Sequence, residues 1–210
     1  MHIYNWFETQ YDSFDRDVVV ENNQRITTLR CPRGSLRKVD GLADDGSWGP
    51  HEHFIKELPD LEIMRYVVEH SRFIPRYERI RTVLEAVGEQ GVADITLMRS
   101  PFGKLVHEYM GFEKVIYALF DDKRVILDFM EFQEVYDLRL AELAAAAPAK
   151  IVILSDHADE NLIAPPYYEQ FCIPHYLKLN DLLHKAGKIV STHLDGNFKR
   201  SEERRVGKEW

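Results

Sequence analysis

The second half of the chain alternates between short apolar strands and amphipathic helices. "KIVILS" at 150–155 is a continuous apolar run of strand length, and "KIVSTHLDG" at 188–196 follows it after a helical segment that stops at Gly187. An apolar run of this kind is typical of a strand buried on both faces of a parallel sheet. A further strand candidate lies at 93–98, and helical patterns separate it from the next strand. This order predicts an α/β fold with parallel strands and right-handed crossovers, either a doubly wound sheet or a TIM (β/α)8 barrel.

Motifs that bind nucleotide phosphates do not follow these strands. Neither GxGxxG nor GxxxxGK[ST] occurs after any of the three strand candidates. Such glycines allow the backbone to approach a phosphate at the start of a helix. The nucleotide-binding form of the doubly wound sheet therefore loses its main support.

The first quarter of the chain has a different character. Residues 1–57 are rich in turn-forming residues and predict an irregular segment with one hairpin arm. In that arm, Ile26–Cys31 would run outward, Pro32-Arg33-Gly34 would turn, and Ser35–Val39 would return;. Helical spacing begins at Leu58, so the main domain is predicted to cover 58–199;.

Charge and cysteine content narrow the class of protein. The net charge of −8 at pH 7 argues against nucleic acid or an anionic membrane surface as partner, because both would repel the chain;. The two cysteines, Cys31 and Cys172, are too few for a disulfide framework and predict reduced thiols;. The sequence opens with no signal-peptide pattern and contains no apolar run of the ~20 residues that a membrane span needs;. We therefore expect a cytoplasmic protein.

Polar residues gather where the three predicted strands end. Arg99 follows the first strand, Asp156 and His157 end the second, and His193 and Asp195 end the third. The carboxyl ends of parallel strands meet at one edge, so Arg99, Asp156 and His193 are predicted to share that edge and to form one site. His193 and Asp195 are two residues apart and face the same way on a regular strand, which suits two ligands of one metal or a base with its orienting partner.

The same residues would also fit purely structural roles. Asp156 or Asp195 would also serve as a cap that accepts hydrogen bonds from the first N–H groups of the next helix. His157 would also fit as a solvated loop residue. Cys172 lies within an apolar helical segment and is expected to be buried and inert;.

The stretch "LSDHADENLIAPPYYEQFCIPHYLKLNDLLHKAGKIVSTHLDGN" resembles the uroporphyrinogen decarboxylase superfamily. "RSPFGKLVHEYMG" and "TLRCPRGSLRKV" resemble two further segments of that group, so the resemblance covers roughly 27–199. The superfamily includes haem-pathway decarboxylases and corrinoid-linked thiol methyltransferases. The resemblance implies a TIM barrel with its site at the carboxyl-terminal mouth. It also implies that the barrel is truncated at both ends, because the family's opening helix and strand and its later strands have no counterpart here.

The resemblance also implies roles for individual residues. His193 matches a histidine that holds zinc in the methyltransferases, and Asp195 stands where their first cysteine ligand would be. Such a zinc ion would act as a Lewis acid. Asp156 and His157 are the catalytic candidates, which would orient the substrate or exchange a proton with it.

The substrate is expected to be a small molecule. Arg99 and Asn197, at the first and third strand ends, are the substrate-binding candidates. The decarboxylases carry an arginine-rich motif of the type "RQAGRY", which is missing here, so the methyl-transfer branch is favoured. That branch implies a corrinoid methyl donor on a partner protein. The alternatives are a tetrapyrrole decarboxylase whose arginine residues lie upstream of Met1 and a non-catalytic member that binds a small molecule.

The last residues differ from the rest of the chain. "RSEERRVGKE" resembles one reading frame of a common short-read sequencing adapter, so 200–210 are expected to be an artefactual tail outside the fold;. The preceding fragment of the barrel is expected to be inactive alone.

Overall fold

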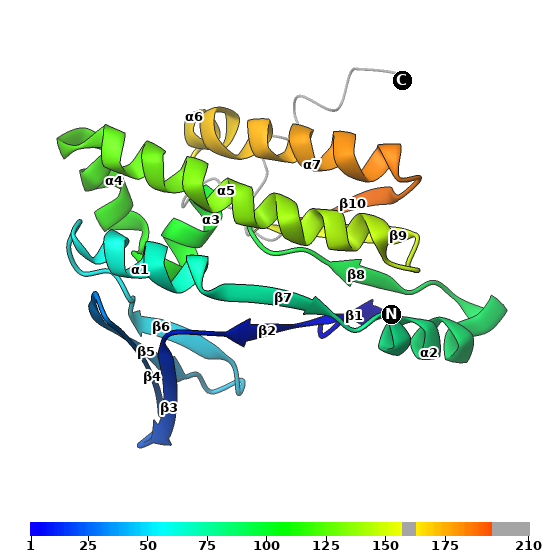
Figure 1. Ribbon diagram of the computed structural model, residues 1–210, viewed down its shortest axis with the longest axis horizontal. Coiled ribbons are helices and arrows are strands. Elements are labelled where there is room, and N and C mark those ends of the chain that lie inside the picture. The colour runs from blue at the N-terminus through cyan, green and yellow to red at the C-terminus, as the bar shows by residue number, and fades with distance from the viewer. Residues whose placement is uncertain (157–162, 195–210) are drawn as a thin grey trace.

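The computed structural model describes residues 1–156 and 163–194 of the chain (Figure 1). The predicted site residues His157, Asp195 and Asn197, and the tail at 200–210, lie outside the described residues. The strands are β1 (His2–Ile3), β2 (Phe7–Tyr11), β3 (Asp15–Glu21), β4 (Gln24–Cys31), β5 (Gly34–Leu42), β6 (Trp48–Glu52), β7 (Ser71–Pro75), β8 (Asp94–Thr96), β9 (Ile151–Asp156) and β10 (Ile189–Leu194). The helices are α1 (Asp60–Glu69), α2 (Tyr77–Val87), α3 (Pro101–Lys104), α4 (Phe112–Asp121), α5 (Lys123–Ala146), α6 (Pro165–Tyr167) and α7 (Ile173–Lys185), with π-helical turns at Leu105–Tyr109 and Tyr168–Cys172 and a 3₁₀ turn at Gly88–Gln90.

Strands β1, β8, β9 and β10 form a parallel sheet in that order. Thr96 pairs with Ile153, and Asp156 pairs with Leu194, so the carboxyl ends of β8, β9 and β10 lie at one edge. The prediction of three neighbouring parallel strands is therefore confirmed. The described strands form an open sheet in a mixed α/β fold, and the closed barrel stays a prediction.

Helices cover one face of this sheet. Helix α5 packs against α7, and Figure 1 shows the two helices running side by side along the sheet. The sequence of α5 contains no glycine or proline, and the buried residues of α5 recur at helical spacing;. The buried residues of α5 are Ile126, Phe129, Met130, Gln133, Asp137, Leu140, Ala141 and Ala144. Two polar side chains, those of Gln133 and Asp137, thus lie on the stripe that faces the core.

The prediction that residues 1–57 are irregular is wrong. Strands β3 to β6 form a four-stranded antiparallel sheet, which we call the arm, and β2 pairs with β7 in a second small sheet. The predicted hairpin is present, because β4 and β5 pair from Cys31↔Gly34 onward and Gly34 has the positive φ of 140° that the tight turn requires;. Strand β3 was missed because all seven of its residues are exposed, so no apolar alternation marks it;.

In the described part of the chain, no helix is both long enough and apolar enough to cross a membrane.

Candidate functional site: a cationic cavity under the arm

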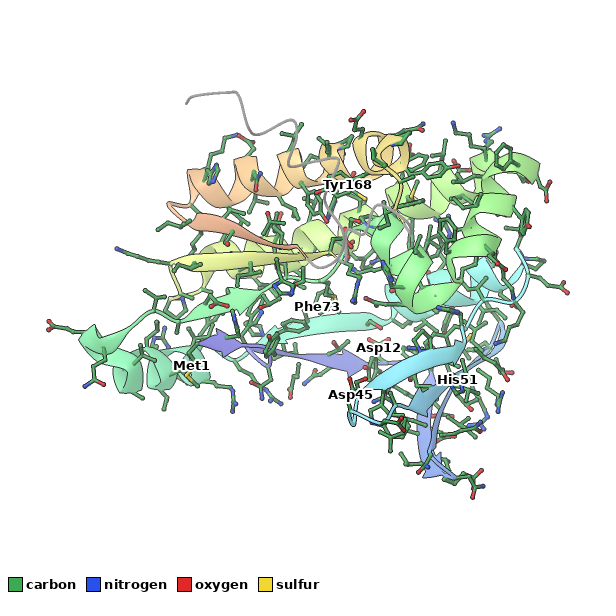
Figure 2. The ribbon with its side chains drawn as sticks, turned by 180° about the vertical axis from the view of Figure 1, so that it is seen from behind. Met1, Asp12, Asp45, His51, Phe73 and Tyr168 are labelled. Atoms are coloured by element: carbon green, nitrogen blue, oxygen red, sulfur yellow. The ribbon has the colours of Figure 1, made fainter. Side chains whose placement is uncertain are left out.

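A cavity of about 390 Å³ lies between the arm, the β2–β7 pair and the helical layer. Its volume is within the range of small-molecule sites. Met98, just beyond the carboxyl end of β8, lines it, so the cavity adjoins the edge at which parallel α/β sheets place their sites;. Phe73, labelled on β7 in Figure 2, is part of its apolar wall. We call this space the arm cavity.

Three charged side chains of the hairpin meet at the wall of the arm cavity. Arg25 donates hydrogen bonds from Nε and Nη2 to Oδ2 of Asp40, at 3.2 and 2.9 Å, and Nζ of Lys38 lies 2.9 Å from Oδ1. Asp40 is only 3% exposed. Its burial acts to raise the pKa of the carboxyl, but the hydrogen bonds and charges of Lys38 and Arg25 outweigh burial and hold that pKa below its usual value;. The guanidinium of Arg25 also stacks on Trp48 at 5.0 Å;.

The hairpin register explains why these residues share one wall. Arg25 pairs with Asp40, and Thr27 pairs with Lys38, so these four side chains belong to the same face of β4 and β5;. All four line the arm cavity. Polar side chains are costly to bury without hydrogen bonds, so their presence on a face turned towards the core marks a candidate binding site.

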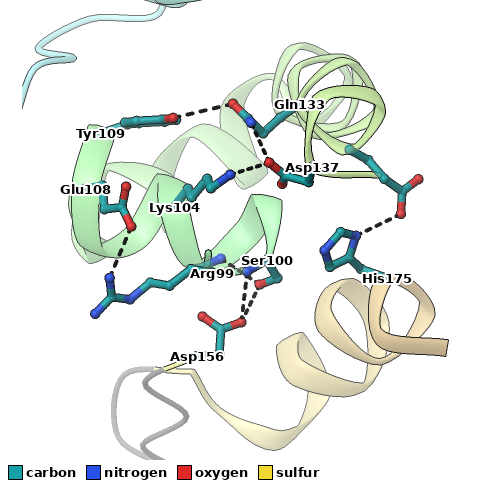
Figure 3. A network of polar contacts seen from close by, with 11 residues as sticks. Arg99, Ser100, Lys104, Glu108, Tyr109, Gln133, Asp137, Asp156 and His175 are labelled. Carbon is teal, nitrogen blue, oxygen red and sulfur yellow. Dashed lines mark hydrogen bonds and ion pairs between the residues drawn. The ribbon is translucent and has the colours of Figure 1, made fainter. Parts of the chain in front are cut away.

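The floor of the arm cavity carries a second charge pair. Lys104 is 1% exposed, and its ammonium donates to Oδ1 of Asp137. Nε2 of Gln133 donates to the same oxygen at 2.9 Å, and the hydroxyl of Tyr109 donates to Oε1 of Gln133 at 3.4 Å (Figure 3). Burial, with the charges of Glu108 and Asp137, raises the pKa of Tyr109 well above its ordinary value, so this hydroxyl keeps its proton. The pair thus holds Lys104 in place under the cavity.

Asp156, a predicted catalytic residue, is buried with 2% exposure at the end of β9. Its Oδ2 accepts hydrogen bonds from Ser100, at 2.5 Å from Oγ and 3.3 Å from N, and from the hydroxyl of Tyr176. Burial raises the pKa of Asp156, although the hydrogen bonds from Ser100 and Tyr176 and the charge of Arg99 oppose the shift;. The carboxyl therefore ties the end of β9 to α3 and α7, and its catalytic role stays a prediction.

His193, the predicted metal ligand, reaches the same edge on the opposite face. It pairs with Ser155, whereas Asp156 follows the alternation of the buried Val152 and Leu154 towards the helices;. His193 is exposed. The structure thus brings Asp156 to Ser100 and Tyr176 and does not bring it to His193.

Arg99, the predicted substrate-binding residue, donates from Nη1 to Oε1 of Glu108 at 3.1 Å. It lines a second cavity of about 490 Å³, which shares Arg25, Lys38 and Asp40 with the arm cavity. Arg25, Lys38 and Asp40, which we call the cationic wall of the hairpin, therefore line both cavities. Arg99 lines the second cavity, which β7 does not contact.

A metal centre is not complete in the described part of the chain. Within residues 1–156 and 163–194, no group of three or more histidine, cysteine, aspartate or glutamate side chains is arranged to hold a metal ion. A catalytic zinc ion normally takes three protein ligands. His193 alone does not make such a site, and Asp195 lies outside the described residues.

Sequence reasoning missed the charged residues of the arm cavity. Lys38 was part of the predicted hairpin and Arg25 and Asp40 flank it directly, but no role was assigned to them. On the paired strands, Arg25 and Lys38 lie on the same face as Leu29 and Leu36. This combination of charge and leucine on one face was the available signal. Lys104 and Asp137 carried no comparable signal, since they come from separate helices.

Comparison with known proteins adds little. No family model matches the chain, and no curated protein matches its sequence. A solved methyltransferase from Methanosarcina mazei superposes with a TM-score of 0.48 at 15% sequence identity, over 72% of this chain and 43% of that one. The chain thus spans less than half of that protein, and a likeness at this level carries no argument about fold or activity.

Proposed function

We propose that the chain is part of a (β/α)8-barrel enzyme of the uroporphyrinogen decarboxylase superfamily that transfers a methyl group to or from a small molecule. The observation that carries the proposal is the arm cavity beside the carboxyl end of β8. Enzymes built on parallel α/β sheets hold their substrates at this edge, where loops after the strands supply the polar groups. The arm covers the cavity and would exclude water from a bound substrate.

The methyl-transfer branch is preferred because of the third strand end. His193-x-Asp195-Gly196 resembles the zinc-binding segment of the thiol methyltransferases. Zinc would supply a Lewis acid that stabilises a substrate thiolate. Because the described residues do not complete its ligand set, His193 and Asp195 remain ligand candidates that need a third partner. A corrinoid protein would deliver the methyl group.

The residues of the arm cavity would bind and orient the substrate. Lys38 and Arg25 offer donors at its wall, and Lys104 places a third cation at its floor. Asp156 would act through others, because its hydrogen bonds fix the loop that leads from β8 into α3.

Decarboxylation of a tetrapyrrole is the second candidate, and it is considered because cations line the arm cavity. A substrate with many carboxylates needs several paired cations. Here Asp40 already engages Arg25 and Lys38, and Asp137 engages Lys104. This pairing leaves too little free positive charge for a polyanion, so we rank methyl transfer first.

The proposal is tested on the longer protein that contains this chain. Transfer of a methyl group from methylcobalamin to a thiol is followed by absorbance, and bound metal is measured by elemental analysis. Replacement of His193 by alanine should remove metal and activity together. His184→Ala is the matched control, because His184 is an exposed histidine in the last turn of α7.

Two results would decide against the metal role. These are equal metal content in the two histidine variants and full activity after exhaustive chelation. Release of CO₂ from uroporphyrinogen, without methyl transfer, would establish the second candidate instead.

A further inference from the structure

We propose that the arm cavity binds an organic monoanion, a carboxylate with an apolar body about the size of one aromatic ring, and that the ammonium of Lys38 is its anchor. The inference deepens the proposed function and rests on it only in making this anion the substrate. The binding itself is a property of the described residues.

Local charge is the first argument. Among the described residues that line the arm cavity, four carry cationic side chains, Arg16, Arg25, Lys38 and Lys104, and one carries a carboxylate, Asp40. The chain as a whole carries a net charge of −8. A positive cavity in an acidic protein attracts anions and disfavours cations.

The balance of pairs indicates a single negative charge on the ligand. Asp137 neutralises Lys104 at the floor. At the wall, Asp40 offsets one of the two charges of Arg25 and Lys38, which leaves one excess positive charge. Arg16 is exposed, and an ion pair in water contributes little;. A second carboxylate near the wall would therefore meet Asp40 without a cation of its own.

The ammonium of Lys38 is held in a fixed position and has N–H donors available for a ligand. An ammonium has three N–H donors, and one of them is directed to Oδ1 of Asp40 at 2.9 Å. The side chain of Lys38 is 18% exposed, and it lines both cavities. Asp40 holds the ammonium before a ligand arrives, which lowers the entropy lost on binding. Arg25 is the weaker anchor, because its Nε and Nη2 groups already donate hydrogen bonds to Asp40.

The rest of the wall is suited to an apolar body. Side chains of β7, α1 and the segments after β2 and β8 supply aromatic, thioether and aliphatic surface, among them Phe14, Met64, Val67, Phe73 and Met98. Burial of a ring against them would remove apolar surface from water and so favour binding. A volume of about 390 Å³ accepts one ring with its carboxylate;.

Benzoate is the probe, and benzamide is the neutral molecule of matching shape. Each is titrated into the chain at low salt and followed by calorimetry and by ligand-observed NMR. We expect benzoate to bind at least tenfold more tightly than benzamide, and added salt to weaken only benzoate. Equal affinity for the two probes, or no saturable binding of benzoate, would overturn the proposal.

Variants of the hairpin locate the anchor. Lys38→Met should weaken benzoate binding at least tenfold and leave benzamide unchanged. Arg30→Met removes the same charge from an exposed position on the same hairpin, where Arg30 pairs with Asp17, and should change neither. An equal effect of the two substitutions refutes Lys38 as the anchor.

Asp40→Asn is the second variant, in case Lys38→Met does not fold, as circular dichroism would show. Asparagine keeps an Oδ1 acceptor that holds the ammonium and removes only the negative charge that competes for Lys38, so benzoate should bind about threefold more tightly or better. Unchanged or weaker binding contradicts the proposal. Binding of benzoate through Lys38 by a protein without methyl-transfer activity would overturn the proposed function alone. Methyl transfer without anion preference would overturn this inference alone.

Discussion

Replacement of Ser100 by alanine should cost about 2.5–4 kcal/mol of folding free energy. Ser100 is fully buried, and its Oγ accepts a hydrogen bond from N of Gly103 at 3.0 Å, which caps α3. The same hydroxyl donates to Oδ2 of Asp156 at 2.5 Å. A lost helix cap costs about 1 kcal/mol, and a lost hydrogen bond to a charged group costs about 1.5–3 kcal/mol. The substitution removes both interactions at once, because the Oγ atom of Ser100 makes both, so the two costs are summed.

A second variant separates the two contributions. Tyr176→Phe removes only the hydroxyl that donates to the same carboxylate oxygen, so it should cost about 2 kcal/mol and leave the cap intact;. Urea unfolding at about pH 7, followed by circular dichroism, gives both values. The midpoint should fall without a change in the slope m, because neither substitution alters the surface exposed on unfolding.

The dependence on pH provides the refuting experiment. Burial raises the pKa of Asp156 in the folded chain above its unfolded value of 3.8. Its contribution to stability is therefore fully present below the unfolded pKa and is lost as pH rises through the folded pKa. The hydrogen bond from Ser100 opposes the shift, so Ser100→Ala should raise the folded pKa further and enlarge the loss at neutral pH. Near pH ~3 the loss should shrink towards ~1 kcal/mol, the value of the cap. A loss below about 1 kcal/mol at neutral pH, or one that is independent of pH, would refute this account of Asp156.

Two further predictions follow from buried groups. Lys104→Met should destabilise the chain by about 3–5 kcal/mol, because it leaves the carboxylate of Asp137 buried without its cation, and urea unfolding of Lys104→Met/Asp137→Leu should recover most of the loss;. Burial raises the pKa of Cys172 to about 12, so iodoacetamide should modify Cys31 in the native chain and spare Cys172 until the chain is unfolded;. Mass spectrometry would contradict this if both thiols reacted at similar rates.

The parallel core could be predicted because its signals are local. The apolar run that became β9 needs no partner to be recognised, since both faces of such a strand are buried;. Helices α1 and α2 follow from apolar spacing and from prolines near their starts;. The helical pattern that follows the strand at 93–98 does not form one continuous helix, because its first part divides into α3 and a π-helical turn. Its apolar pattern does not encode that change of hydrogen bonding.

The arm was only partly predictable, because its outer strand depends on pairing. Strand β3 gains its hydrogen bonds from β4 through a two-residue turn at Asn22 and Asn23, which have φ values of 49° and 57°. Adjacent asparagines with positive φ are a turn signal that would have indicated this hairpin. The cationic wall depends further on the register of β4 against β5, which composition does not reveal;.

Strand ends identify an edge, but alternation decides the face. His193 and Asp195 were predicted to face one way from their spacing of two, and the same rule applied to β9 separates Ser155 from Asp156. Asp156 continues the buried side of β9 and is held by hydroxyl donors under the helices. Ser155 lies in register with His193 on the other side. A substrate that reaches His193 from that face would therefore meet the hydroxyl of Ser155 before the carboxylate of Asp156, which makes Ser155 the better candidate for direct contact and Asp156 the better candidate for holding the edge in place.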